Sequence, residues 1–204
     1  MVEVNISKKI STVADILQVN TSFESGANTQ IFGPSGSGKT TLLKILAGLT
    51  IPEQGYIAVD GQVWLDTARK TSLPVQKRNL GFVFQDYALF PNMTVLQHLN
   101  YGTEDESYVQ HLLDMGKMTG LQHHKPRHLS GGQQQRLAIL RALSTKPKLL
   151  LMDEPFSALD KVLKQQLIAD LRVLLKTLGT TCLVVTHQPL EEGIFADFSF
   201  EIGA

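Results

Sequence analysis

The sequence predicts an α/β fold built around a largely parallel sheet. Short apolar runs of strand length alternate with stretches in which leucine and isoleucine recur at helical spacing, the pattern expected for that fold class. The 204 residues, 43% of them hydrophobic and 19% charged, are enough for one domain with a sizeable core. This composition excludes a disordered chain.

Charge and cysteine usage exclude further classes of protein. Lys+Arg and Asp+Glu both number 19, so the chain lacks the basic excess typical of nucleic-acid binding, and we expect no nucleic-acid partner. The single cysteine, Cys182, cannot form an intrachain disulfide. The first residues lack the pattern of a signal peptide, and no run approaches the roughly 18 apolar residues of a membrane span.

The first part of the chain is expected to form strands around one helix. Residues 2–6 alternate apolar and polar, apolar positions in 42–49 have helical spacing, and Asp60 with Gly61 is a hairpin-turn sequence. The expected elements are edge strands in 1–27, a strand over 29–32, a helix from about residue 40, hairpin strands over 56–59 and 62–65, a polar loop over 66–79 and a buried strand over 80–84.

Residues 86–146 change character, because aromatic residues and polar turns replace the alternation of strand and helix. We therefore expect a helical lobe inserted into an α/β core formed by 1–85 and 147–204, all within one domain. Ser130 and Gln133 have the spacing of a capping box, which predicts a helix start there. After Pro147 the expected elements are a strand over 148–152, a helix over 159–178 that ends at Gly179, and a strand over 181–185.

One segment has the pattern of a phosphate-binding loop, in which four residues separate two glycines and Lys-Thr follows the second glycine. Backbone N–H groups of such a loop surround a polyphosphate, the lysine bridges the β- and γ-phosphates and the threonine hydroxyl ligates Mg²⁺. The alternative is a glycine-rich turn with an incidental lysine, which the expected flanking strand and helix disfavour. The predicted binding residues are Gly33, Pro34, Ser35, Gly36, Ser37, Gly38, Lys39, Thr40 and Thr41.

Two acidic residues follow the apolar run of residues 149–152. Asp153, at the end of the expected strand, is placed to hold Mg²⁺ through water, and Glu154 is placed to orient an attacking water molecule. Taken alone, the pair is equally compatible with a solvated turn; together with the phosphate-binding loop it indicates hydrolysis.

The segment Leu129-Ser130-Gly131-Gly132-Gln133 opens a predicted helix, and its hydroxyl and free N–H groups suit a second anion site or simple helix capping. It also resembles the signature motif of ATP-binding-cassette (ABC) ATPases. The resemblance covers essentially the whole chain in the right order. It includes the phosphate-binding loop, Gln85 after a strand, the acids at 153–154, residues 157–160 as the D-loop, and His187.

The resemblance implies a P-loop NTPase of ABC type, with a RecA-like core sheet, an antiparallel N-terminal β region and an inserted helical lobe. It implies ATP as substrate and Mg²⁺ as cofactor. Gln85 would contact Mg²⁺ and the attacking water, Glu154 would be the catalytic glutamate, and His187 would contact the γ-phosphate. Ser130, Gly131, Gly132, Gln133 and Asp160 would act across the interface of two chains that enclose two ATP molecules.

Residues 80–91 resemble importer ATPases of the molybdate, sulfate, ferric-iron and polyamine type. This implies a cytoplasmic subunit on the inner face of the membrane, a separate permease and an extracytoplasmic solute-binding protein. The alternative is a non-transport ABC ATPase that acts as a mechanical factor, which the single cassette, the lack of a long insertion and the balanced charge disfavour. A P-loop kinase or GTPase would lack the segment at 129–133.

The chain departs from the family at three places. Residues 8–14 contain no aromatic residue to stack on adenine, so we expect weak discrimination between ATP and GTP. Gln188 stands where an acidic residue is common after the histidine. The sequence ends at Ala204, before the place of the C-terminal regulatory domain that many importer ATPases carry, so we expect either a minimal subunit or a trimmed sequence.

Overall fold

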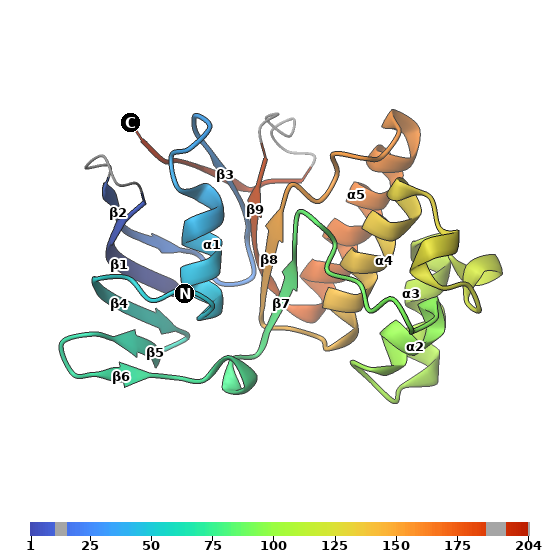
Figure 1. Ribbon diagram of the computed structural model, residues 1–204, viewed down its shortest axis with the longest axis horizontal. Coiled ribbons are helices and arrows are strands. Elements are labelled where there is room, and N and C mark those ends of the chain that lie inside the picture. Colours follow the sequence, from blue (N-terminus) through green and yellow to red (C-terminus); the bar gives the residue numbers. More distant parts are fainter. Residues whose placement is uncertain (11–15, 187–194, 204) are drawn as a thin grey trace.

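The computed structural model describes residues 1–10, 16–186 and 195–203, and it contains two sheets with helices between and beside them (Figure 1). An antiparallel sheet has the order β2-β1-β4-β5-β6, and a parallel sheet has the order β10-β3-β9-β8-β7. The antiparallel strands are β1 (Val2–Lys9), β2 (Ile16–Phe23), β4 (Gln54–Val59), β5 (Gln62–Asp66) and β6 (Thr71–Ser72). The parallel strands are β3 (Asn28–Phe32), β7 (Leu80–Val83), β8 (Leu149–Asp153), β9 (Thr181–Val185) and β10 (Phe198–Glu201).

Helix α1 lies between the two sheets, and the other helices lie on the far face of the parallel sheet (Figure 1). The α-helices are α1 (Lys39–Ala47), α2 (Val95–Asn100), α3 (Glu106–Met115), α4 (Gly131–Ser144) and α5 (Lys161–Leu178). Short 3₁₀ turns cover Val75–Lys77, Thr119–Leu121 and Pro126–His128. Among these helices, none is both long and apolar enough to cross a membrane.

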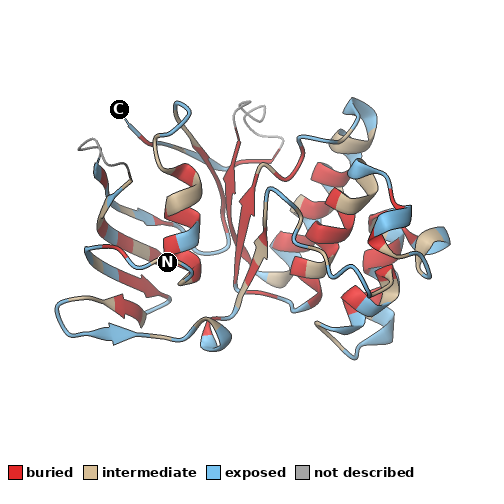
Figure 2. Ribbon diagram, viewed as in Figure 1, coloured by how far each residue is buried: buried red, intermediate tan, exposed pale blue. Residues whose placement is uncertain are grey.

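The parallel sheet is buried on both faces, as Figure 2 shows for its central strands. On β8, Leu149 and Leu151 pack with α1 and the antiparallel sheet, whereas Leu150 and Met152 pack with the helices on the other face. The side chains of β9 alternate in the same way. Two covered faces explain why both strands are apolar at almost every position and do not alternate in sequence.

The chain between β7 and β8 contains only helices and loops, as expected for residues 86–146. Three N-terminal caps start these helices: Thr94 and Ser130 each form a capping box, and the Asp105 carboxylate accepts from the Tyr108 N–H. Their apolar faces meet in one core, which includes Leu99, Leu112 and Leu140 and continues onto the parallel sheet. The inserted helices therefore share one hydrophobic core with β7 and β8.

Arg78 connects the end of α1 to the antiparallel sheet. The residue is 5% exposed, and its guanidinium group donates to the carbonyl oxygens of Leu46 at 2.7 Å, Leu73 at 3.0 Å and Trp64 at 3.2 Å. The last carbonyl groups of a helix have no partner within the helix, and Arg78 supplies one for α1. This contact ties the last turn of α1 to the antiparallel sheet, and the phosphate-binding loop precedes the first turn of the same helix.

Most expected elements are present, and the hairpin turn is made by Asp60 and Gly61 with φ values of 48° and 79°. Two expectations were wrong, and one strand was missed. Strand β1 is not at an edge, because it pairs with both β2 and β4. The expected loop over 66–79 contains β6 and a 3₁₀ turn. Strand β10 was not expected, because it lies at a sheet edge and is mostly exposed, so its sequence lacks an apolar run.

Candidate functional site

The phosphate-binding loop connects β3 to α1 at the carboxyl end of the parallel sheet. Gly33 has a φ of 149°, and a Cβ there would clash with the carbonyl oxygen of Ile202. Gly36 has a φ of 82°, and a Cβ there would have no neighbour within 4 Å. Glycine is therefore needed at Gly33 for close backbone packing and at Gly36 for a left-handed turn on the open side of the loop.

The Lys39 ammonium group is folded back onto its own loop. Its Nζ atom donates to the carbonyl oxygens of Gly33 and Pro34, both at 2.8 Å, and the residue is 6% exposed. A buried cation bonded to neutral acceptors keeps its charge close to the place where a polyphosphate would lie. The loop and its lysine therefore have the charge and the donors of an anion site.

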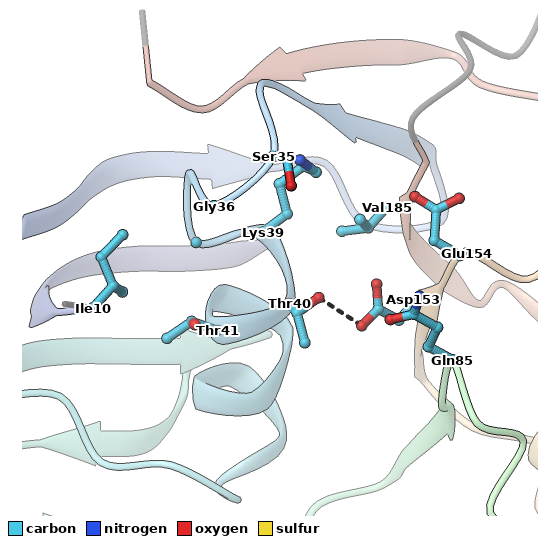
Figure 3. Close-up of a pocket in the computed structure, with 11 residues that line it drawn as sticks. Ile10, Ser35, Gly36, Lys39, Thr40, Thr41, Gln85, Asp153, Glu154 and Val185 are labelled. Atoms are coloured by element: carbon cyan, nitrogen blue, oxygen red, sulfur yellow. Dashed lines mark hydrogen bonds between the residues drawn. The ribbon is translucent and has the colours of Figure 1, made fainter. Parts of the chain in front are cut away.

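Thr40 and Asp153 meet across the sheet edge. The Thr40 hydroxyl donates to Asp153 Oδ2 at 2.8 Å, and Asp153, the last residue of β8, is 4% exposed (Figure 3). A hydroxyl and a carboxylate oxygen are hard donors of the kind that Mg²⁺ prefers. Within the described residues, no group of three or more His, Cys, Asp or Glu forms a metal site. The pair fits a Mg²⁺ ion that takes few protein ligands and completes its shell with phosphate and water.

A cavity of about 440 Å³ lies beside this pair, which is large enough for a small-molecule ligand. Figure 3 shows Asp153 directed toward Thr40, with Gln85 next to Asp153 and with Glu154 near Val185. The lining residues are Ile10, Ser35, Gly36, Gly38, Lys39, Thr40, Thr41, Gln85, Asp153, Glu154 and Val185. The structure thus gathers most of the predicted phosphate, metal and catalytic residues around one space.

Glu154 occupies a strained turn directly after β8. Its φ is 50°, in the left-handed region that residues with a Cβ disfavour, and its N–H donates to the Val185 carbonyl at 3.0 Å. This turn lets consecutive acids take different directions, so that Asp153 is directed toward Thr40 and Glu154 toward Val185 (Figure 3). Two adjacent carboxylates thereby serve two different parts of the cavity.

The segment 130–133 does not line this cavity. The Ser130 hydroxyl accepts from the Gln133 N–H at 3.3 Å, and Gln133 Oε1 accepts from the Ser130 N–H at 2.8 Å, so the predicted capping box is confirmed. Asp160 caps α5 by accepting from the Leu163 N–H at 3.0 Å. Within one chain these residues stay apart from the phosphate-binding loop.

Gln135, on α4, holds the turn that contains Glu154. Its amide nitrogen donates to the Glu154 carbonyl at 3.1 Å and to Ser157 Oγ at 3.2 Å, and its oxygen accepts from the Ala158 N–H at 3.0 Å. The residue is 1% exposed. The sequence contained no signal for this role, because a glutamine within a helix carries no indication of which loop it faces.

Two parts of the expected site lie outside the described residues, namely His187 with Gln188, and residues 11–14 of the segment 8–14 that lacks an aromatic residue. Ile10, just before the second part, lines the cavity. Val185 lines it as well and was not singled out from the sequence; its place at the end of an apolar strand is the signal that would have found it.

The comparisons with known proteins agree with one another. A family model described as ABC transporter matches residues 16–157. The sulfate/thiosulfate import ATP-binding protein CysA of Mesostigma viride is 43% identical over 201 residues, covering 95% of this chain and 56% of that protein. The molybdenum import ATP-binding protein ModC of Photobacterium profundum is 43% identical over 188 residues, covering 91% and 52%. The chain thus spans about half the length of these relatives.

A solved structure supports the same grouping. The ATP-binding cassette MJ0796, described as a dimer in a post-hydrolysis state bound to ADP and Pi, matches with a TM-score of 0.81 and 31% identity. The match covers 100% of this chain and 97% of that one. The similarity includes both sheets and the inserted helices.

Replacing Gln135 by leucine is expected to lower the free energy of unfolding by about 2 kcal/mol, because the Glu154 carbonyl and the Ala158 N–H lose a buried partner. Urea unfolding followed by circular dichroism measures this change. The matched control is Gln110→Leu at an exposed position of α3, for which we expect a change within about 0.5 kcal/mol. Equal losses in the two variants would contradict the assigned role.

Proposed function

The chain belongs to the ABC transporter family, and from this premise we propose that it binds ATP and hydrolyses it to power transport through a separate membrane permease. The observation that carries the proposal is the cavity at the sheet edge, where Lys39, the Thr40–Asp153 pair, Gln85 and Glu154 come together. Each of these groups has a role in phosphoryl transfer to water.

ATP binding would begin at the phosphate-binding loop. The backbone N–H groups of the loop and the N-terminus of α1 supply donors and partial positive charge. Lys39 would exchange its two carbonyl partners for phosphate oxygens, and this exchange is favourable because a hydrogen bond between two charged groups is stronger. The aliphatic Ile10, at the far end of the lining in Figure 3, would contact the base.

In the hydrolytic step, a water oxygen attacks the γ-phosphorus and the bond to the β–γ bridging oxygen breaks, which releases ADP and inorganic phosphate. Glu154 would orient this water and accept its proton, since its carboxylate borders the cavity. Gln85 would hydrogen-bond to the same water from the carboxyl end of the neighbouring strand β7. His187 is proposed to contact the γ-phosphate.

Thr40, Asp153 and Gln85 are the residues that would hold Mg²⁺. Bound there, the ion would neutralise charge on the β- and γ-phosphates. The 2.8 Å contact between the Thr40 hydroxyl and Asp153 places both oxygens together before any ion is present, so little rearrangement of the protein is needed.

We propose that two copies of the chain complete the site. Ser130, Gly131, Gly132, Gln133 and Asp160 are at helix starts that do not line the cavity of their own chain, so a second chain is needed for them to reach a phosphate. The MJ0796 cassette, which shares the fold, is described as a dimer. ATP would then act as the contact between the two chains, and its hydrolysis would separate them.

The relatives named as import proteins for sulfate/thiosulfate and molybdenum support an importer. We propose that the chain works on the cytoplasmic face of the membrane, beside permease subunits and together with an extracytoplasmic solute-binding protein. The alternative, a non-transport ABC ATPase acting as a mechanical factor, is the second candidate that the experiments below separate.

Glu154→Gln is expected to lower kcat for ATP hydrolysis by at least about 100-fold, because the amide keeps the shape of the side chain but accepts no proton. The Kd for ATP should stay within about threefold, since Glu154 is proposed to act on water. With ATP, this variant should run as a two-chain assembly on size-exclusion chromatography. The control is the exposed Glu106→Gln on α3. Turnover of Glu154→Gln at the parental rate would contradict the assignment.

The preference for ATP over GTP is expected to be small, with Kd values within about threefold of each other. The side chain of Ile10 contacts a purine only by dispersion and has no group that distinguishes an amino from an oxo substituent. Titration with fluorescent analogues of both nucleotides measures the ratio. A preference for ATP above about 30-fold, equal to roughly 2 kcal/mol, would contradict this expectation.

The transport proposal is tested by purifying the tagged chain, at native expression level, from detergent-solubilised membranes and identifying the associated proteins by mass. We expect a polytopic permease to copurify. Recovery exclusively in the soluble fraction, with ribosomes, with DNA or alone, would favour the mechanical factor and leave the proposed ATP chemistry intact.

A further inference from the structure

The loop after Gln85 has an unusual backbone. Tyr87 and Ala88 are consecutive residues with φ values of 64° and 45°, both in the left-handed region that a Cβ disfavours. Within the loop, the Tyr87 N–H donates to the Phe84 carbonyl at 3.0 Å and the Ala88 N–H donates to the Asp86 carbonyl at 2.8 Å. Two consecutive residues keep this disfavoured conformation only where contacts with the surrounding structure stabilise it.

Arg141, on α4, supplies these contacts. Its Nη1 donates to the Ala88 carbonyl and its Nη2 donates to the Tyr87 carbonyl at 3.3 Å, so one guanidinium group holds both left-handed residues. Its Cζ atom lies 5.6 Å from the centre of the Phe90 ring. The planar fork of an arginine suits two neighbouring acceptors, whereas a lysine offers one point of charge.

His98, on α2, anchors the end of the same loop. Its Nε2 atom accepts from the Phe90 N–H at 3.0 Å, and its Nδ1 lies 2.7 Å from the Thr94 carbonyl, which together define the neutral form with the proton on Nδ1. The residue is fully buried, and burial lowers its pKa. The loop from Gln85 to Phe90 is therefore held at one end by β7 and farther along by two helices.

We propose that Arg141 is a positioning residue that sets the place of Gln85 in the cavity and transmits movements of α4 to it. Gln85 is two residues before Tyr87, and α4 begins at the segment 130–133. Any displacement of this helix pulls the carbonyls of Tyr87 and Ala88, and with them Gln85. The proposal rests on the proposed ATPase function, because the effect of Arg141 on Gln85 is measured as a change in the rate of ATP hydrolysis.

The test uses the full chain with Arg141→Lys and Arg141→Ala. We expect Arg141→Lys to lower kcat about tenfold, since a displaced catalytic contact slows chemistry without changing the remaining contacts to the nucleotide. The Kd for ATP and the melting temperature should stay close to those of the parent. Arg69→Ala, which removes a cation from the exposed loop between β5 and β6, is the matched control and should keep the parental kcat.

Rescue by glycine distinguishes positioning from general support. Ala88→Gly removes the penalty of the left-handed conformation. The kcat of the double variant Arg141→Ala with Ala88→Gly should therefore be at least about threefold higher than the kcat of Arg141→Ala. If Arg141→Ala fails to fold, the same comparison is made with Arg141→Lys alone and combined with Ala88→Gly. Absence of rescue with an intact fold would overturn the proposal.

Hydrogen exchange separates this proposal from the ATPase assignment. In Arg141→Lys, amides in residues 85–90 should exchange faster, whereas those in 153–158, held by Gln135, should not change. If the parental chain does not hydrolyse ATP, the proposed function is refuted. The hydrogen-exchange rates of residues 85–90 would then still test whether Arg141 holds the loop. Unchanged exchange in 85–90, or parental kcat in Arg141→Lys, would refute the role of Arg141.

Discussion

The site depends on one constraint, the parallel sheet whose two faces are both covered. Because β3, β7 and β8 run in the same direction, their carboxyl ends lie at one edge, where they place the phosphate-binding loop, Gln85 and the two acids. The contact between Thr40 and Asp153 spans 113 positions of sequence yet closes at 2.8 Å. Without the buried sheet these residues would have no common cavity.

Helix α4 adds a second constraint. It holds the turn with Glu154 through Gln135 and the loop after Gln85 through Arg141. Both segments contain left-handed residues that carry a Cβ, and such conformations need external hydrogen bonds to persist. One helix therefore stabilises two strained segments that follow the neighbouring strands β7 and β8, and its own start bears the residues proposed to reach a second chain.

The Lys39 ammonium group has hydrogen-bond acceptors within the protein before a ligand binds. Its ammonium group bonds two loop carbonyls, so its charge is neither exposed to bulk water nor left without acceptors. Those acceptors are neutral, and the phosphate oxygens of a nucleotide would carry negative charge. The loop is thus stable alone and still favours exchange toward an anion.

Features that depend on local pattern were predictable from the amino-acid sequence alone. These include the phosphate-binding loop, the acids at the end of β8, the turn at Asp60 and Gly61 and the capping box of Ser130. Tertiary structure decided what depends on distant partners. The interior place of β1, the edge strand β10, and the contacts of Gln135 and Arg141 are set by strand pairing and by packing between segments far apart in the chain. Residue spacing indicates periodicity and turn type, but it does not indicate which distant backbone group a side chain will contact in the folded chain.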